Sequence, residues 1–296
     1  MDNNSNQRKS IIYALLAVSF WSTVATSFKL CLAELDILTM LTIASVTSTI
    51  VLFAAVQIKG KGLEILKNTP GEFLNSAFLG LINPFLYYLI LFKAYSLLPA
   101  QIAQPLNMIW PIILAFLSVP LLKQKISARS ITALLISFAG VYIISSKGNP
   151  FNPGHTNPLG VLLATGSSVF WAFYFIMNIR DKRDEAVKLF LNFFFGSLYL
   201  LLMVLATGNY GEISLKGALL AIYIGIFEMG ITFLLWLKAL SLAKSTTTIS
   251  NFAYLSPLIS LFFINHVLGE HVYITTLAGL LMIIAGILVS NKQNNK

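Results

Sequence analysis

The sequence predicts an all-α membrane protein with ten transmembrane helices arranged as two inverted five-helix repeats. Apolar residues make up 57% of the chain and charged residues only 10%, whereas soluble domains carry about 25% charged residues. Apolar runs of roughly 20 residues, the length that crosses the hydrocarbon core of a bilayer, recur along the chain. One sequence stretch also occurs twice, and its two copies relate the first half of these runs to the second half.

The duplicated stretch joins neighbouring apolar runs. A K-A-x-S-L box at residues 93–97 returns at 238–242, and a proline follows in the next run each time, at Pro111 and Pro257. Further matching pairs are Phe20-Trp21 with Phe170-Trp171, Gly80 with Gly225, Asn83 with Glu228, and Ala139-Gly140 with Ala285-Gly286. Matches at a nearly constant interval indicate an internal duplication, so function is expected where the two copies face each other.

The apolar runs predict ten spans. They lie at residues 11–29, 36–57, 73–95, 100–122, 127–146, 158–178, 187–207, 216–237, 246–267 and 272–290. The Pro/Gly-rich residues 148–157 are expected to link a first repeat at 1–147 to a second at 158–296. Because each repeat has an odd number of spans, the second copy enters the membrane upside down, and a substrate site is expected near the midplane.

Basic residues predict the orientation. With both termini in the cytoplasm, nearly all loop Lys and Arg residues fall on the cytoplasmic side, and only Lys29, Lys147 and Lys216 fall outside. This rule accounts for the net charge of +9, so no nucleic-acid partner is expected. The first ten residues are polar and no cleavage site follows the first run, which predicts a retained span. We expect a multi-pass protein of the inner (cytoplasmic) membrane, in contact with lipid.

Glu228 is the one acidic residue that lies deep in a predicted span. An ionisable side chain at mid-bilayer costs several kcal/mol and usually faces a cavity or a partner. Thr232 follows one turn later on the same face, and the matching face of the third span carries Asn83 and Tyr87. These four residues are therefore candidates for a substrate or proton site.

A structural ion pair is the alternative for Glu228. Lys93 and Lys238 are the basic residues within spans, and each lies ten residues from Glu228 or from its counterpart Asn83. That spacing is about 15 Å along a helix, and the two lysines point towards opposite membrane faces. Glu228 is therefore expected to bind a proton or a substrate ammonium group, and the sequence leaves both roles open.

The prolines point to the same depth. A proline inside a helix leaves the carbonyl four residues earlier without its N–H partner, so Pro111 and Pro257 are expected to kink their spans. In lipid such a carbonyl must face protein, water or ligand. Polar and aromatic candidates beside these sites, or at equivalent places in the first and sixth spans, are Asn107, Trp110, Asn251, Tyr254, Trp21 and Trp171. Kinks that serve packing alone are the alternative interpretation.

The chain lacks the patterns of cofactor and metal sites. Its single cysteine, Cys31, excludes an intramolecular disulfide and a cysteine-based metal cluster. The histidines have no metal-binding spacing and no Gly-rich phosphate loop occurs, so neither metal nor cofactor is expected. Glu270, beside His271, is expected to be solvated. A binding-only receptor or scaffold is disfavoured by the short loops, and an intramembrane enzyme by the lack of a nucleophile–base pair within the spans.

Small residues mark the fifth and tenth spans. Ala133 and Gly140 lie on one face of the fifth, and Gly279 and Gly286 on one face of the tenth. Small residues let helix backbones approach closely. We expect packing within a monomer, with a homodimer surface as the alternative.

Together these residues resemble the EamA family of the drug/metabolite transporter superfamily. The resemblance covers the whole chain and includes the repeated Phe-Trp pair and Leu268-Gly269-Glu270 followed by Ala285-Gly286; Gln124 replaces the usual Glu in the first repeat. It implies a secondary transporter, not an enzyme, that moves a small molecule by alternating access, commonly by export of amino acids or similar metabolites. Aromatic candidates suit amphipathic or cationic substrates.

Overall fold

A computed structural model describes residues 3–122, 128–149, 156–208, 211–242, 249 and 251–291. These residues are mainly helical and contain no strand, so the all-α prediction is confirmed. In chain order the elements are α1 (Asn3–Leu32), α2 (Ile37–Ile58), α3 (Gly62–Leu66), α4 (Pro70–Gly80), η1 (Leu81–Leu86), α5 (Tyr87–Leu97), α6 (Ala100–Asn107), α7 (Trp110–Leu122), α8 (Ala128–Ser145), α9 (Pro158–Arg180), α10 (Glu185–Thr207), α11 (Leu215–Phe227), α12 (Ile231–Leu242), η2 (Asn251–Tyr254), α14 (Leu255–Leu268) and α15 (Ile274–Asn291).

The helices have the lengths and composition of membrane spans. Seven helical stretches are long and apolar enough to cross a membrane, among them the combined stretches Pro70–Leu97 and Leu215–Trp236. Three shorter apolar helices, Ile131–Ser145, Phe252–Leu268 and Ile274–Val289, accompany them. The chain is therefore an α-helical membrane protein, and the number of ten spans stays a prediction.

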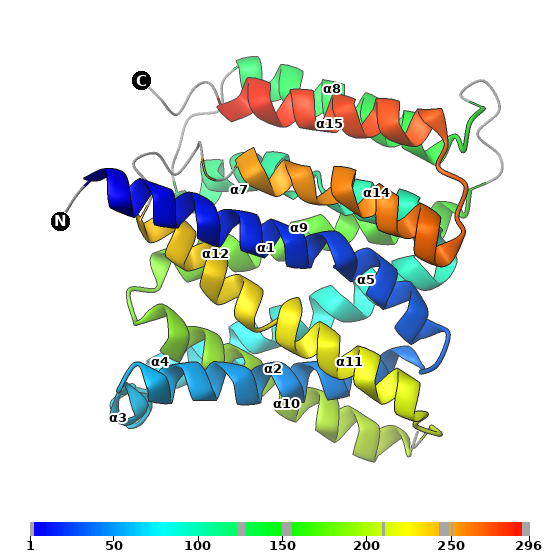
Figure 1. Cartoon of the computed structure of the whole chain (residues 1–296). Helices are drawn as coiled ribbons and strands as arrows, with labels where there is room; N and C mark the ends of the chain where they lie inside the picture. Colours follow the sequence, from blue (N-terminus) through cyan, green and yellow to red (C-terminus); the bar gives the residue numbers. More distant parts are fainter. Residues whose placement is uncertain are drawn as a thin grey trace.

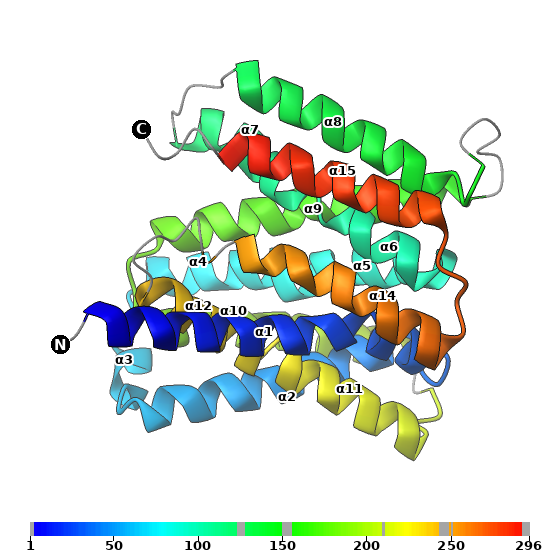
Figure 2. The ribbon, with the colours of Figure 1, turned by 45° about the horizontal axis from the view of Figure 1, so that its top comes forward.

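The two halves of the chain pack in a matching way. α1 packs against α12 and α14, and its counterpart α9 packs against α5 and α7. Likewise α2 packs against α11 and α10 against α4, while α2–α10 and α8–α15 pair equivalent helices. α1 begins and α15 ends at one end of the bundle, and α8 ends at the opposite end (Figures 1 and 2). An inverted repeat produces this two-fold arrangement.

Polar caps determine where several spans begin. The side chains of Asp36, Asp184 and Ser214 accept hydrogen bonds from the first backbone N–H groups of α2, α10 and α11. Thr69 and Glu72 form a reciprocal capping box at the start of α4. These caps satisfy N–H groups that a helix leaves unpaired at its start, so each span begins at a defined residue.

Four spans are interrupted at matching places in the two halves. The π-helix η1 joins α4 to α5, and within it Asn83 leaves helical geometry (φ −149°, ψ 120°). A turn at Met108 and Ile109 separates α6 from α7. In the second half, a turn at 228–230 separates α11 from α12, and the 3₁₀-helix η2 precedes α14. The third, fourth, eighth and ninth predicted spans therefore share this feature.

Pro111 and Pro257 each lie inside an apolar span, directly after an irregular stretch of that span. Pro111 is in the first turn of α7, after the turn at 108–109, and Pro257 is in the first turn of α14, after η2. The irregular stretch comes just before each proline, as expected for a proline within a span. The carbonyl of Asn107, four residues before Pro111, accepts a 2.9 Å hydrogen bond from the Ser168 hydroxyl of α9. The protein thus supplies the partner that the membrane cannot.

Packing within the bundle accounts for the small residues of α8 and α15. A Cβ built on Gly140 would lie 2.6 Å from the Gly279 carbonyl oxygen, and one on Gly279 would lie 2.5 Å from the Gly140 carbonyl oxygen. A Cβ on Gly286 would lie 2.7 Å from the Ala133 carbonyl oxygen. The two backbones therefore touch along the stripe that the sequence identified.

This close contact predicts the effect of adding one methyl group. Gly140→Ala and Gly279→Ala should each destabilise the protein by about 1–3 kcal/mol, the usual cost of overpacking, and lower the unfolding temperature in detergent. Gly166→Ala on α9 is the matched control, because no atom lies within 4 Å of its added Cβ and alanine favours a helix. Equal unfolding temperatures for all three variants would contradict the close α8–α15 contact.

Candidate functional site

Glu228 lies at an interrupted span, directly after α11 ends at Phe227. Its Oε1 accepts a 3.1 Å hydrogen bond from the Tyr88 hydroxyl of α5, while its buried Oε2 has no hydrogen-bond partner among the described residues. Within the same residues no basic side chain forms an ion pair with it. A half-satisfied carboxylate in apolar surroundings is costly, so the site favours a proton on Glu228 or a cation beside it.

Helix α2 holds the turn that carries Glu228. The Ser48 hydroxyl donates a 2.8 Å hydrogen bond to the Met229 carbonyl, and Thr232 donates to the Phe227 carbonyl. Gly225 allows the close approach of α11 to α2, because a Cβ there would lie 2.7 Å from Cβ of Thr47. The backbone groups freed by the turn are therefore satisfied by protein, which fixes the Glu228 backbone in place.

A cavity of about 190 Å³ lies beside Glu228 and is bordered by helices from both halves. Its polar lining residues are Gln104, Asn107, Asn178, Glu185, Lys188, Glu228 and Ser256. Besides Glu228, the buried Gln104 Oε1 and Ser256 Oγ have no hydrogen-bond partner in the part of the chain that the structure describes. Buried polar atoms are usually paired, so a polar ligand in this cavity would find three groups open to it.

Aromatic rings form much of the cavity wall. The Trp171 ring of α9 lies between Tyr87 of α5 and Phe233 of α12, with centroid distances of 5.1 and 5.4 Å. Trp110 follows at 6.4 Å from Trp171. Such rings offer apolar contact and, through their faces, attraction to cations. The wall therefore suits a small amphipathic or cationic molecule.

Asn107 connects this wall to α9. Its Oδ1 accepts a 3.3 Å hydrogen bond from the Tyr87 hydroxyl, and its Nδ2 donates at 2.8 Å to the Ser167 hydroxyl. The Ser168 hydroxyl also donates a hydrogen bond to the Asn107 carbonyl, so α9 binds both the side chain and the backbone of this residue. Asn107 thereby positions the Tyr87 ring at the edge of the cavity.

The structure brings together six of the ten residues that the sequence singled out. The six that line the cavity are Trp21, Tyr87, Asn107, Trp110, Trp171 and Glu228. Asn83, Thr232 and Tyr254 are buried outside this lining. The extended backbone of Asn83 takes this residue out of the helical face that it would share with Tyr87. The side chain of Asn251 lies outside what the structure describes.

Sequence reasoning missed part of the lining, notably Gln104, Tyr174, Asn178, Lys188, Trp236 and Ser256. The charge pattern counts Lys188 among the cytoplasmic basic residues, at the very start of the predicted span 187–207, but α10 begins at Glu185 and buries Lys188 about one turn inside. Ser256 directly precedes Pro257, so its place beside an interrupted span was a usable signal. Nothing in the sequence marks Gln104 or Asn178.

The model of the EamA-like transporter family matches the chain twice, at residues 8–146 and 158–292. The chain belongs to the EamA-like transporter family. The double match confirms the internal repeat and the resemblance seen in the sequence. Membership makes this protein a membrane transporter.

Several relatives match most or nearly all of this EamA transporter. An uncharacterized transporter of Clostridium kluyveri is 27% identical over 98% of this chain and 95% of its own. The uncharacterized transporter YvbV of Bacillus subtilis is 27% identical over 77% of this chain and 74% of its own. One crystal structure matches 95% of this chain and 96% of its own at 18% identity, with a TM-score of 0.66, which supports the fold.

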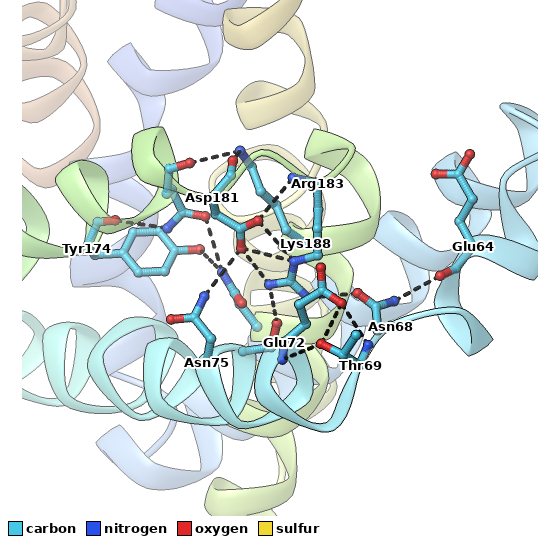
Figure 3. A network of polar contacts seen from close by, with 12 residues as sticks. Glu64, Asn68, Thr69, Glu72, Asn75, Tyr174, Asp181, Arg183 and Lys188 are labelled. Atoms are coloured by element: carbon cyan, nitrogen blue, oxygen red, sulfur yellow. Dashed lines mark hydrogen bonds and ion pairs between the residues drawn. The ribbon is translucent and has the colours of Figure 1, made fainter.

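A polar network joins the two EamA repeats near Lys188 (Figure 3). Arg183, between α9 and α10, donates to Asp181 from Nη2 at 2.5 Å, and also to Asn68 Oδ1 and Ser76 Oγ, both at 2.9 Å. Burial raises the pKa of the Asp181 carboxyl, but hydrogen bonds from Arg183 outweigh burial and leave the pKa below its usual value. Asp181 is therefore ionised at neutral pH and neutralises Arg183.

Glu270 ties the opposite end of the bundle, so its expected solvation is corrected. Its two carboxylate oxygens accept hydrogen bonds from the backbone N–H groups of Ala100 (2.9 Å) and Gln101 (3.2 Å) at the start of α6. The Gln101 side chain donates at 2.6 Å to the His271 carbonyl. A carboxylate at a helix N-terminus is stabilising. The α14–α15 connection of the second repeat is thus fastened onto the first.

Loss of the Glu270 carboxylate should loosen the start of α6. A side-chain cap contributes about 1 kcal/mol, or roughly a fivefold change in an opening equilibrium. Glu270→Ala should therefore speed hydrogen exchange at the Ala100 and Gln101 amides about fivefold. Glu212→Ala, which removes an exposed carboxylate, should leave these amides unchanged. Unchanged exchange in both variants would show that Glu270 does not hold α6.

Proposed function

We propose that this EamA transporter exports a small metabolite, an amino acid or a similar amphipathic or cationic compound, across the cytoplasmic membrane by alternating access coupled to proton movement. The observation that carries the proposal is the Glu228 carboxyl, which borders the cavity with one oxygen unpartnered among the described residues. An intramembrane acid of this kind binds a proton or a cationic group that arrives.

The aromatic wall supports the substrate class. A protonated amine beside Glu228 has Tyr87 and Trp171 as neighbours across the same cavity. Ring faces attract ammonium groups by about 0.5–2 kcal/mol, more when water is excluded. The apolar remainder of the lining accommodates a side chain of an amphipathic molecule. Together these features favour a compound with one amine and an apolar body.

The extent of the cavity lining supports export. Glu185 is in the lining and is exposed, and it begins α10 at the end of the bundle where α1 begins (Figure 1). By the positive-inside rule this end is cytoplasmic. The lining thus reaches the cytoplasmic end while Glu270 ties the far end, which gives an exported substrate a route of entry. Outward release then requires the Glu270 contacts to break.

The test is a flux screen on purified protein in proteoliposomes. We expect uptake or efflux of at least one radiolabelled amino acid, accelerated by a pH gradient. Protein-free liposomes and liposomes with the Glu228→Gln variant are measured in parallel. Absence of flux for all twenty amino acids would contradict the proposed substrate class.

The Glu228→Gln variant separates the two roles of the acid. Gln keeps the shape and the acceptor for the Tyr88 hydroxyl but cannot exchange a proton. If Glu228 carries the proton, gradient-driven flux is lost while substrate-for-substrate exchange survives. If Glu228 binds the substrate amine, both modes fail. Glu212→Gln is the matched control and should transport like the wild type. Wild-type behaviour of Glu228→Gln in both modes would show that Glu228 has no role in transport.

A further inference from the structure

Lys188 is a buried cation on the border of the same cavity. Its side chain is 8% exposed, and it lies about one turn inside α10. Nζ donates hydrogen bonds to the carbonyls of Asn178 at 2.9 Å and Asp181 at 3.0 Å, at the C-terminal end of α9 (Figure 3). A lysine ammonium has three N–H donors, so these two bonds leave one donor available.

Lys188 has acidic neighbours, but none in the described part of the chain contacts its ammonium group. Glu185, one turn earlier on α10, is exposed and attracts the ammonium from a distance, as does Asp181. The Asp181 carboxylate is bound by the Arg183 guanidinium, with Nη2 at 2.5 Å, and the Asp184 carboxylate lies 3.1 Å from Nζ of Lys61. No carboxylate lies within 4 Å of Lys188 Nζ in the described ranges of the chain. A buried ammonium group with no carboxylate in contact is only partly compensated by more distant acids, and that is costly. A negatively charged ligand group would remove that cost.

A purely structural role, in which Lys188 caps α9, explains only part of this arrangement. Lysine near a helix C-terminus does bind the last carbonyls and interacts favourably with the helix dipole. That role does not need the residue to border a cavity. It also leaves the third N–H and the positive charge without a function, since a neutral amide could donate to the same two carbonyls.

We propose that Lys188 binds the carboxylate of the transported substrate, so that the cavity selects dipolar amino acids over their amides. The proposal rests on the proposed transport of amino acids and adds a specificity-determining residue. Lys188 supplies a cation held in position by two carbonyls, and Glu228 supplies an acidic group on the same cavity. A molecule with both an ammonium and a carboxylate group matches both residues.

The test compares one acid with its own amide. The probes are the radiolabelled amino acid with the highest flux in the twenty-amino-acid screen and the corresponding amide. Wild-type protein should prefer the acid. A hydrogen bond between charged groups contributes about 1.5–3 kcal/mol, so Lys188→Gln should raise KM for the acid roughly 10–150-fold and leave KM for the amide nearly unchanged. Lys188→Arg keeps the charge and should retain much of the preference.

Two controls separate charge recognition from folding. Lys182→Gln removes an exposed lysine from the same α9–α10 connection and should leave both KM values unchanged. If Lys188→Gln does not yield a monodisperse protein, the acid-to-amide ratio of the wild type decides, because equal KM values there would overturn the proposal.

The remaining outcomes distinguish the two proposals. Amino-acid flux with an acid-to-amide ratio that Lys188→Gln leaves unchanged would overturn the role of Lys188 alone, and a parallel loss for both probes would assign Lys188 to capping α9. Absence of amino-acid flux in the wild type would contradict the proposed function and the carboxylate site together.

Discussion

The backbone hydrogen-bonding requirement of a membrane is the constraint on which this structure depends. Each interrupted span exposes N–H and C=O groups that lipid cannot satisfy. Here neighbouring helices supply partners: Ser168 binds the Asn107 carbonyl, Ser48 binds the Met229 carbonyl, and Thr232 binds the Phe227 carbonyl. These contacts permit the interruptions, and the interruptions place Glu228 and Asn107 at the edge of the cavity rather than inside continuous helices. The cavity therefore follows from where the spans break.

The two EamA repeats share a backbone plan but carry different chemistry. Glu228 and Asn83 occupy equivalent interruptions, yet only Glu228 borders the cavity, while Asn83 is fully buried with neither polar side-chain atom partnered among the described residues. Lys188 adds a cation from α10 of the second repeat. A duplicated fold thus provides an acid, Glu228, and a base, Lys188, from its second repeat rather than two equal sites. Under the proposed function, this asymmetry gives a single substrate a defined orientation.

The sequence was sufficient for the fold class, the repeat and part of the aromatic wall. Repeated boxes and apolar periodicity report directly on helices, and an acid within an apolar run is conspicuous, which is why Glu228, Trp171 and Asn107 were found. The burial of Lys188 and the capping role of Glu270 could not be predicted, because both depend on tertiary contacts. Lys188 lies near the polar start of α10 and donates to carbonyls at the end of α9. Glu270 caps the start of α6, which is far away in sequence. Charge patterns along the chain carry no information about such partners.

Carbodiimide labelling of the purified transporter tests the central claim most directly. A hydrophobic carbodiimide modifies protonated carboxyl groups in apolar surroundings, and mass spectrometry locates the adduct. The account predicts that Glu228 is modified, that lowering the pH speeds the modification, and that the transported amino acid at saturating concentration slows it. Exposed Glu212 is the internal reference. An unmodified Glu228, or a modification rate that the amino acid leaves unchanged, would contradict the claim that Glu228 forms part of the substrate site.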